Sequence, residues 1–260
     1  MPMSSQESMM PAETGQTMIA IDSIHKSFDE NHVIRGVSME VHAGEVCTII
    51  GVSGCGKSTL LRLIGGLESP DLGSIRLAAP DYSFVFQYSA LFDSLTVLEN
   101  VAFSLLEEPD TLDTKPHQLS KKEIRELAIE KLRLLGLEGI EDKYPNELSG
   151  GMKKRVSFAR AIVSDPKIIL YDEPTAGLDP VASTMMEDYI LKLRDEFGAA
   201  SVVVTHQHST IHRAADKVCL LHEGQIQWAG TPHELSTSSN PYAHQFANGS
   251  LEGPLTAEHH

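Results

Sequence analysis

Apolar and polar positions along the chain predict the strands of a central sheet with helices between them. β-rich runs punctuated by Gly36 and Gly44 span residues 18–25, 33–41 and 45–50. The runs at residues 46–50, 168–171 and 202–205 are almost continuously apolar. Such runs are typical of strands covered on both faces in a parallel or mixed sheet. A further helix and a hairpin are predicted at residues 210–215, 217–222 and 225–229. We therefore expect an α/β fold.

A long, mostly helical segment is inserted between the first and second of these buried strands. Ser120 and Glu123 form a capping box at the start of its clearest helix, since each side chain can bond the backbone amide of the other. One apolar stripe follows, made of Ile124, Leu127, Ala128, Leu132 and Leu135. Gly136 is placed to end this helix. An earlier helix is predicted at residues 97–106, and a loop at residues 107–117 joins the two.

Both ends of the chain differ in pattern from the middle. Residues 1–17 are polar and hold too little apolar surface to offset the entropy of ordering, so we expect them to be disordered. From Thr231 the chain is again polar and punctuated by proline. We interpret residues 18–230 as the folded domain and residues 231–260 as a tail that adds nothing to its core.

Composition narrows the classes of function. The 260 residues include 21 Lys plus Arg against 36 Asp plus Glu, a formal net charge of −15, which argues against a nucleic-acid partner held by its phosphates. No apolar stretch approaches the roughly 20 residues that cross a bilayer, and the N-terminal segment lacks the regions of a signal peptide. The cysteines are odd in number and lack metal-ligand spacing, which predicts reduced thiols. We therefore expect a cytoplasmic protein.

A glycine-rich segment between a buried strand and an apolar helix predicts a phosphate-binding loop. It consists of Gly51, Val52, Ser53, Gly54, Cys55, Gly56, Lys57, Ser58 and Thr59. The glycines let backbone amides face one concavity, and the helix N-terminus adds positive potential. Lys57 is suited to the β- and γ-phosphates of a nucleotide, and Ser58 to Mg²⁺. The spacing also predicts a Cys55 thiol close to the nucleotide, which ATP would protect from alkylation, whereas the thiol of Cys47 on a buried strand stays inert.

Two carboxylates end the next buried strand. Asp172 stands where it could hold the metal through water, and Glu173 could orient or deprotonate the attacking water. A strand that ends in Asp-Glu is more often solvated than catalytic. Together with the upstream loop, however, these residues indicate nucleotide hydrolysis.

A second helix N-terminus is also suited to an anion. Ser149, Gly150 and Gly151 precede a helix that carries several basic residues, Lys153, Lys154, Arg155 and Arg160. A chain that binds one nucleotide needs only one such site. The second therefore indicates a phosphate held by a partner.

These motifs carry a resemblance to a known family. In order and spacing, the phosphate loop, Gln87, residues 148–151, residues 172–173, Asp179 and His206 form a specific set. With this set the sequence resembles the ATP-binding subunit of ABC transporters from Met18 to about Pro232. The resemblance implies a P-loop NTPase with a RecA-like core, an antiparallel β subdomain and an inserted α-helical subdomain at about residues 89–164. It also implies ATP hydrolysis, with ATP and Mg²⁺ bound.

The resemblance gives roles to further residues. Phe28 matches the aromatic residue that stacks on adenine, although the residues alone fit a core phenylalanine equally well. Gln87 matches the glutamine that touches Mg²⁺ and the attacking water and couples the site to the membrane subunit. Asp179 matches the loop acid that crosses the dimer interface, and His206 the switch histidine that contacts the γ-phosphate. The implied catalytic set is Lys57, Gln87, Glu173 and His206, and the implied metal ligands are Ser58, Gln87 and Asp172.

Three segments point to one branch of the family. Residues 87–103, 148–155 and 246–254 look like those of the Mla-type, MCE-associated ATPases of phospholipid transport, called TGD-type in plastids. This resemblance implies a head-to-tail dimer with a second copy, separate transmembrane permease subunits and an MCE-domain lipid-binding protein. It places the chain on the cytoplasmic face of the inner membrane.

Two other functions stay open. One is the ATPase subunit of an importer or exporter for amino acids, metals or lipoproteins, which shares every catalytic residue. The other is a soluble ABC ATPase of DNA repair or translation, which the single cassette and the lack of a coiled coil disfavour. For the tail, Tyr242 and Phe246 are expected either to dock on the second copy or to complete the core of their own subunit.

Overall fold

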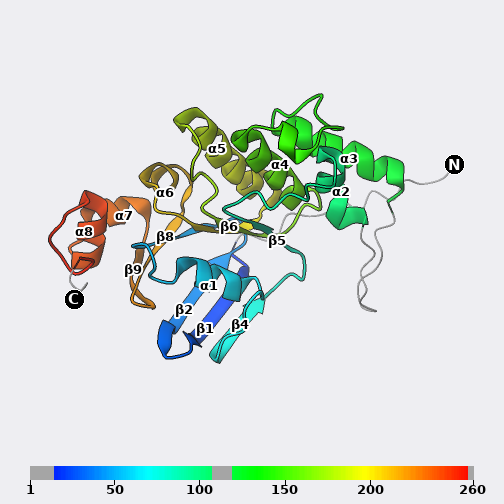
Figure 1. Ribbon diagram of the computed structural model, residues 1–260. Helices are drawn as coiled ribbons and strands as arrows, with labels where there is room; N and C mark the ends of the chain where they lie inside the picture. The colour runs from blue at the N-terminus through cyan, green and yellow to red at the C-terminus, as the bar shows by residue number, and fades with distance from the viewer. Residues whose placement is uncertain (1–14, 107–118, 257–260) are drawn as a thin grey trace.

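The larger of two sheets organises the molecule. The computed structural model describes residues 15–106 and 119–256 of the chain. In this part the larger sheet has the strand order β5-β6-β7-β3-β8-β9, and neighbouring strands are parallel except for β8 and β9 (Figure 1). Its strands are β3 (Val46–Ile50), β5 (Tyr82–Val85), β6 (Ile168–Asp172), β7 (Ala200–Val204), β8 (Lys217–His222) and β9 (Gln225–Gly230).

A smaller antiparallel sheet lies beside α1 and follows the order β2-β1-β4 within the described residues (Figure 1). Its strands are β1 (Thr17–Phe28), β2 (Asn31–His42) and β4 (Leu72–Leu77). The sequence pattern does not predict β4, because most of its residues are exposed and its apolar residues do not alternate regularly with polar ones. The expected α/β class with an antiparallel subdomain is confirmed.

The helices cover both faces of the larger sheet. They are α1 (Lys57–Ile64), α2 (Val97–Leu106), α3 (Lys121–Leu134), the 3₁₀ turn η1 (Pro145–Glu147), α4 (Gly150–Ile162), α5 (Pro180–Phe197), α6 (His208–Ala214), α7 (Pro232–Thr237) and α8 (Pro241–Asn248). The predicted capping box of α3 is present, with the Ser120 oxygen accepting the Glu123 amide at 3.3 Å. α5 was not predicted; Asp179 caps it and Pro180 opens it. Within the described residues no helix has both the length and the apolar character to cross a membrane.

Side chains that alternate along each strand divide the core into two layers. In β6, Ile168 and Leu170 pack with α1 and the smaller sheet. Ile169 and Tyr171 pack on the opposite face with α2, α3, α4 and α5. All of these side chains are buried, which explains why the strand sequence is continuously apolar.

The C-terminal segment differs from the tail that the sequence pattern indicates. Leu235 of α7 and Ala243 of α8 are buried against Ile50 and Leu220, and Tyr242 packs on the same cluster. The pattern is misleading because each helix is short, begins with a polar cap and a proline, and buries few apolar side chains. Residues 231–256 therefore add to the core.

Two predictions concern residues 1–17 and 107–117, which the structure describes only in part or not at all. The predicted loop at residues 107–117 lies outside the described residues, as do residues 1–14 and 257–260. Within the expected disordered segment, Gln16 is placed, because its carbonyl accepts the Ala43 amide at 2.8 Å. β1 begins at Thr17, one residue before the predicted start.

Leu235→Ala should destabilise the folded chain, because Leu235 is 1 % exposed in the cluster beneath α7 and α8. A truncated leucine in a core costs about 2–5 kcal/mol. Leu251→Ala is the matched control, since Leu251 is 88 % exposed and should change the free energy of unfolding by less than about 0.5 kcal/mol. Chemical denaturation measures both, and equal stability of the two variants would show that α7 is not part of the core.

Candidate nucleotide-binding site

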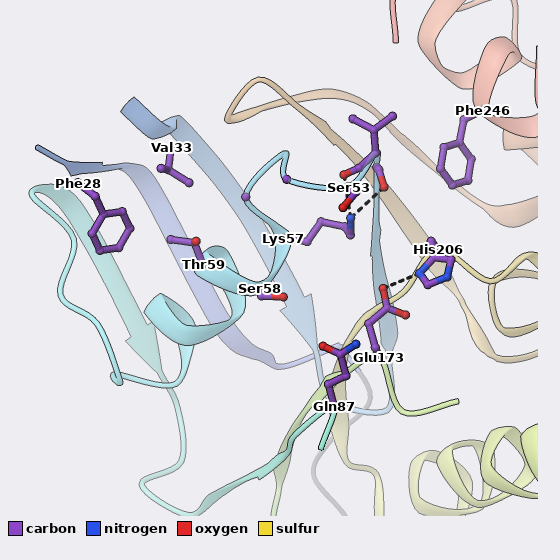
Figure 2. A pocket seen from close by; sticks show the side chains of 14 residues that line it. Phe28, Val33, Ser53, Lys57, Ser58, Thr59, Gln87, Glu173, His206 and Phe246 are labelled. Atoms are coloured by element: carbon purple, nitrogen blue, oxygen red, sulfur yellow. Dashed lines mark hydrogen bonds and ion pairs between the residues drawn. The ribbon is translucent and has the colours of Figure 1, made fainter. Parts of the chain in front are cut away.

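The carboxyl ends of four parallel strands meet around one cavity of about 790 Å³ (Figure 2). The loops that follow β3, β5, β6 and β7 contribute to its wall, as expected for the ligand site of a parallel α/β sheet. Of the predicted site residues, the cavity is lined by Phe28, Gly51, Val52, Ser53, Gly54, Gly56, Lys57, Ser58, Thr59, Gln87, Glu173 and His206. The strand order alone thus gathers residues from distant parts of the sequence.

The loop between β3 and α1 depends on glycine at two positions. Gly51 has φ 151°, and a Cβ there would overlap the Leu221 carbonyl oxygen. Gly56 caps α1 with φ 106°. The buried Lys57 ammonium turns back over the loop and donates to the carbonyls of Gly51 at 2.9 Å and Val52 at 3.0 Å. Lys57 therefore lies where it can neutralise a phosphate bound in the loop.

Cys55 lies in this loop, but its thiol is directed away from the cavity. The side chain is buried in the layer formed with α1 and the smaller sheet, and it is absent from the described lining of the cavity. Burial raises the pKa of the Cys55 thiol, and the nearby Lys57 charge opposes this shift in part. The expectation of a thiol facing the nucleotide is therefore not met, because the side chain fills core space.

Ser58, Asp172 and Gln87 offer oxygen atoms near one end of the loop. The Ser58 hydroxyl donates to Asp172 Oδ1 at 3.0 Å, and Gln87 lines the adjoining cavity. Burial raises the pKa of the Asp172 carboxyl, the Ser58 hydrogen bond opposes this shift, and the Glu173 carboxylate adds to it. A cation beside Asp172 would offset the cost of keeping this carboxylate charged.

This set of donors suits Mg²⁺, which prefers oxygen ligands. Among the described residues, however, no group of three or more His, Cys, Asp and Glu side chains is placed to hold a metal ion. A magnesium ion here would need phosphate oxygens of the substrate to complete its coordination, as is usual for sites with one or two carboxylates.

Glu173 and His206 form the polar pair opposite the loop (Figure 2). Glu173 Oε1 lies 2.8 Å from His206 Nδ1, whereas Glu173 Oε2 is buried without a hydrogen-bond partner among the described residues. The Glu173 backbone has φ 48°, in the left-handed region that a non-glycine residue rarely adopts. Its amide donates to the Val204 carbonyl at 2.9 Å, which holds this conformation in place. Such local strain is typical of functional sites.

The remaining predicted residues lie away from this cavity. Ser149 caps α4 by accepting the Met152 amide at 3.3 Å, and Ser149 and Gly150 are exposed. Asp179 accepts the amides of Val181 at 2.9 Å and Ala182 at 3.0 Å. None of these residues lines the cavity that contains Lys57.

Aromatic side chains stand at two sides of the cavity. Phe28 is 44 % exposed, so it is not the core phenylalanine of the alternative interpretation, and Lys26 Nζ lies 5.2 Å from its ring centroid. Phe246 of α8 lines the cavity on the side of His206 (Figure 2). Its ring stacks on that of His208 at 5.5 Å, and Tyr242 packs on His222 at 5.4 Å.

Both aromatic rings of α8 therefore contact their own chain, as in the alternative in which they complete the core of their own subunit.

Phe246 and Val33 line the cavity but were not predicted from the sequence. Val33 belongs to β2, and the alternation of apolar and polar residues in this strand does not show which side chains face the cavity. The spacing of Tyr242 and Phe246 is the one feature of the sequence that could have indicated Phe246 as a lining residue.

The fold and the phosphate loop define a P-loop NTPase. The family model described as ABC transporter matches residues 34–176. The chain belongs to this family: it is an ABC ATPase that binds and hydrolyses ATP as a subunit of a transporter.

Relatives and solved structures agree with this assignment. Protein TRIGALACTOSYLDIACYLGLYCEROL 3, chloroplastic, of Arabidopsis thaliana is 44 % identical, over 92 % of this chain and 75 % of that protein. Sulfate/thiosulfate import ATP-binding protein CysA 2 of Shewanella oneidensis is 37 % identical, over 88 % of this chain and 66 % of that protein. The dimeric post-hydrolysis structure of the ATP-binding cassette MJ0796 with ADP and Pi has a TM-score of 0.73 and 30 % identity, over 83 % of this chain and 99 % of that one.

Native protein should resist thiol alkylation with and without ATP, because Cys47, Cys55 and Cys219 are all buried. Ser53→Cys provides the matched control, since Ser53 is exposed in the same loop and lines the cavity. That variant should react rapidly and be protected by ATP. Mass spectrometry after timed labelling measures both. Rapid labelling of Cys55 that ATP suppresses would show instead that its thiol faces the nucleotide.

Proposed function

We propose that this ATPase powers the transport of phospholipid or a related lipid through a separate membrane permease. The observation that carries the proposal is the 44 % identity, along 92 % of the chain, to an Arabidopsis protein whose name refers to a glycolipid. The resemblance of residues 87–103 and 246–254 to lipid-transport ATPases supports it. Sulfate import is the second candidate, because relatives named for that activity reach 37 % identity.

The cavity supplies the groups that ATP hydrolysis needs. Phe28 stacks on the adenine ring, and the loop amides with Lys57 bind the phosphates. Ser58, Gln87 and Asp172 would hold Mg²⁺ together with the phosphates, and the ion would supply positive charge beside the phosphate oxygens. Glu173 orients the attacking water and accepts its proton, while His206 fixes the Glu173 carboxylate by their 2.8 Å contact and faces the γ-phosphate.

A second copy of the chain completes each site. Ser149, Gly150 and Asp179 are exposed and lie outside the cavity of their own chain. In a head-to-tail pair, the α4 N-terminus of one copy would meet the nucleotide bound by the other and supply amides to its phosphate. The dimeric structure of the related cassette MJ0796 with ADP and Pi supports this arrangement. ATP would then join the two copies, and hydrolysis would release them.

The segment after Gln87 is the surface proposed for the permease. Tyr88 is 80 % exposed, and Phe86 and Phe92 are also exposed. Arg160 donates to the Ala90 carbonyl at 2.9 Å, which ties this segment to α4. Gln87 itself lines the nucleotide cavity, so movement at the site would reach this aromatic surface. The chain would thus lie on the cytoplasmic face of the membrane, with an MCE-domain lipid-binding protein as a further partner.

Glu173→Gln should keep the affinity for ATP but reduce turnover by about a hundredfold or more, because an amide cannot accept the proton of the attacking water. The closed ATP-bound dimer should accumulate. Glu196→Gln on the exposed side of α5 is the control and should hydrolyse ATP at the parental rate. Nucleotide binding and phosphate release measure the two properties. Parental turnover by Glu173→Gln would contradict its assignment as the base.

The lipid cargo can be tested with the complete transporter, purified through this chain and reconstituted in vesicles. We expect ATP to drive transfer of a labelled phospholipid between membranes and to leave labelled sulfate outside. Glu173→Gln in the same complex is the control for ATP dependence. ATP-driven sulfate uptake without lipid transfer would replace the lipid proposal by the second candidate and leave the ATPase assignment intact.

A further inference from the structure

A buried polar chain lies behind the reacting groups and has no part in the mechanism above. Thr175, Glu187 and Thr210 are all fully buried. The Thr210 hydroxyl donates to Glu187 Oε1 at 2.9 Å, and Thr175 Oγ1 lies 3.2 Å from Thr210 Oγ1. Glu187 Oε2 lies 3.0 Å from Arg213 Nε as an ion pair, although within the described residues this oxygen has no hydrogen bond. Burying a carboxylate is costly unless it is paired and hydrogen-bonded, so its presence here calls for a physical reason.

The order of donors in this chain follows from the chemistry of its groups. A carboxylate paired with a guanidinium accepts hydrogen bonds, so the single proton of Thr210 is directed to Glu187. Thr210 must then accept at its oxygen, and Thr175 is the donor. Each bond thus has one direction, and each group is fixed by the next.

The chain connects the segments that present the reacting pair. Thr175 lies two residues after Glu173, and Thr210 lies four residues after His206. Glu187 belongs to α5, the helix that follows the same loop and begins at Pro180. Glu173 and His206 therefore contact each other on the cavity side, while Thr175 and Thr210 contact each other on the buried side.

We propose that Thr175, Thr210 and Glu187 are positioning residues, which hold the loop of Glu173 and the helix after His206 in the relative placement that hydrolysis requires. The inference rests on the proposed roles of Glu173 and His206. Apolar packing alone would let the loop and α6 slide, whereas directional hydrogen bonds in a dry interior fix their separation. A displacement of about 1 Å at reacting groups can cost on the order of a hundredfold in rate.

Thr210→Val tests this inference because valine keeps the shape and removes the hydroxyl. In the full chain we expect kcat for ATP to fall about tenfold, as for a small misplacement of a catalytic group. KM and ATP affinity should stay near the parental values, since the phosphate loop is not touched. Thr210→Ser, which keeps the hydroxyl, should restore most of the turnover. Thr175→Val removes only the hydrogen bond between Thr175 and Thr210 and should also lower kcat.

Thr48→Val is the matched control. Thr48 is a fully buried threonine of β3, and its hydroxyl has no hydrogen-bond partner in the described part of the chain. This variant should keep the parental kcat. Thermal unfolding of every variant separates turnover from stability.

The inference would be overturned if Thr210→Val and Thr175→Val kept the parental kcat, or if Thr48→Val lost as much turnover as they do. It would also be overturned if Thr210→Ser gave no recovery. These outcomes differ from failure of the proposed function, in which the unmodified chain would not hydrolyse ATP or Glu173→Gln would retain full turnover. If Thr210→Val does not fold, the kcat of Thr175→Val is compared with that of Thr48→Val and tests the inference in its place.

Discussion

Parallel pairing of β7 with β6 and β3 is the interaction on which the rest of the molecule depends. Val204 lies opposite both Asp172 of β6 and Ile49 of β3. Because these strands end together, the phosphate loop, Glu173 and His206 leave the sheet at the same edge. A slip of one residue would turn every buried side chain to the opposite face. The apolar layers that prevent such a slip therefore also set the geometry of the site.

The site concentrates groups that a stable core would avoid. Lys57, Asp172 and Glu173 are all buried at the end of the sheet. Burial raises the pKa of the Asp172 carboxyl, and Glu173 combines a left-handed backbone with an oxygen lacking a hydrogen bond within the described structure. Phosphates and a cation bring charges that complement these groups. Substrate binding therefore reduces the free-energy cost of burying these charged groups. Without substrate, the packing of the apolar layers on both faces of the sheet offsets this cost.

Local patterns predicted much of the fold and site, whereas long-range contacts stayed hidden. Buried strands, the capping box at Ser120 and the glycine-rich loop each leave a signal within a few residues. The orientation of Cys55 does not, because the smaller sheet against which it packs comes from other parts of the chain. The bond between Thr210 and Glu187 joins residues 23 apart in sequence, and neither residue stands out in its own segment. α7 and α8 were missed because burial of Leu235 shows only in the folded chain.

The C-terminal helices show how a segment with little apolar surface can still support the site. Gln245 is buried in α8 and accepts the Leu255 amide at 2.6 Å, so the chain beyond the helix is tied back to it. Phe246 of the same helix stacks on His208 at the start of α6. α6 is thus held on one side by this ring and on the other by the bond from Thr210. An element fixed from two sides has few alternative positions, so His206 is presented to the cavity by a rigid support rather than by a free loop.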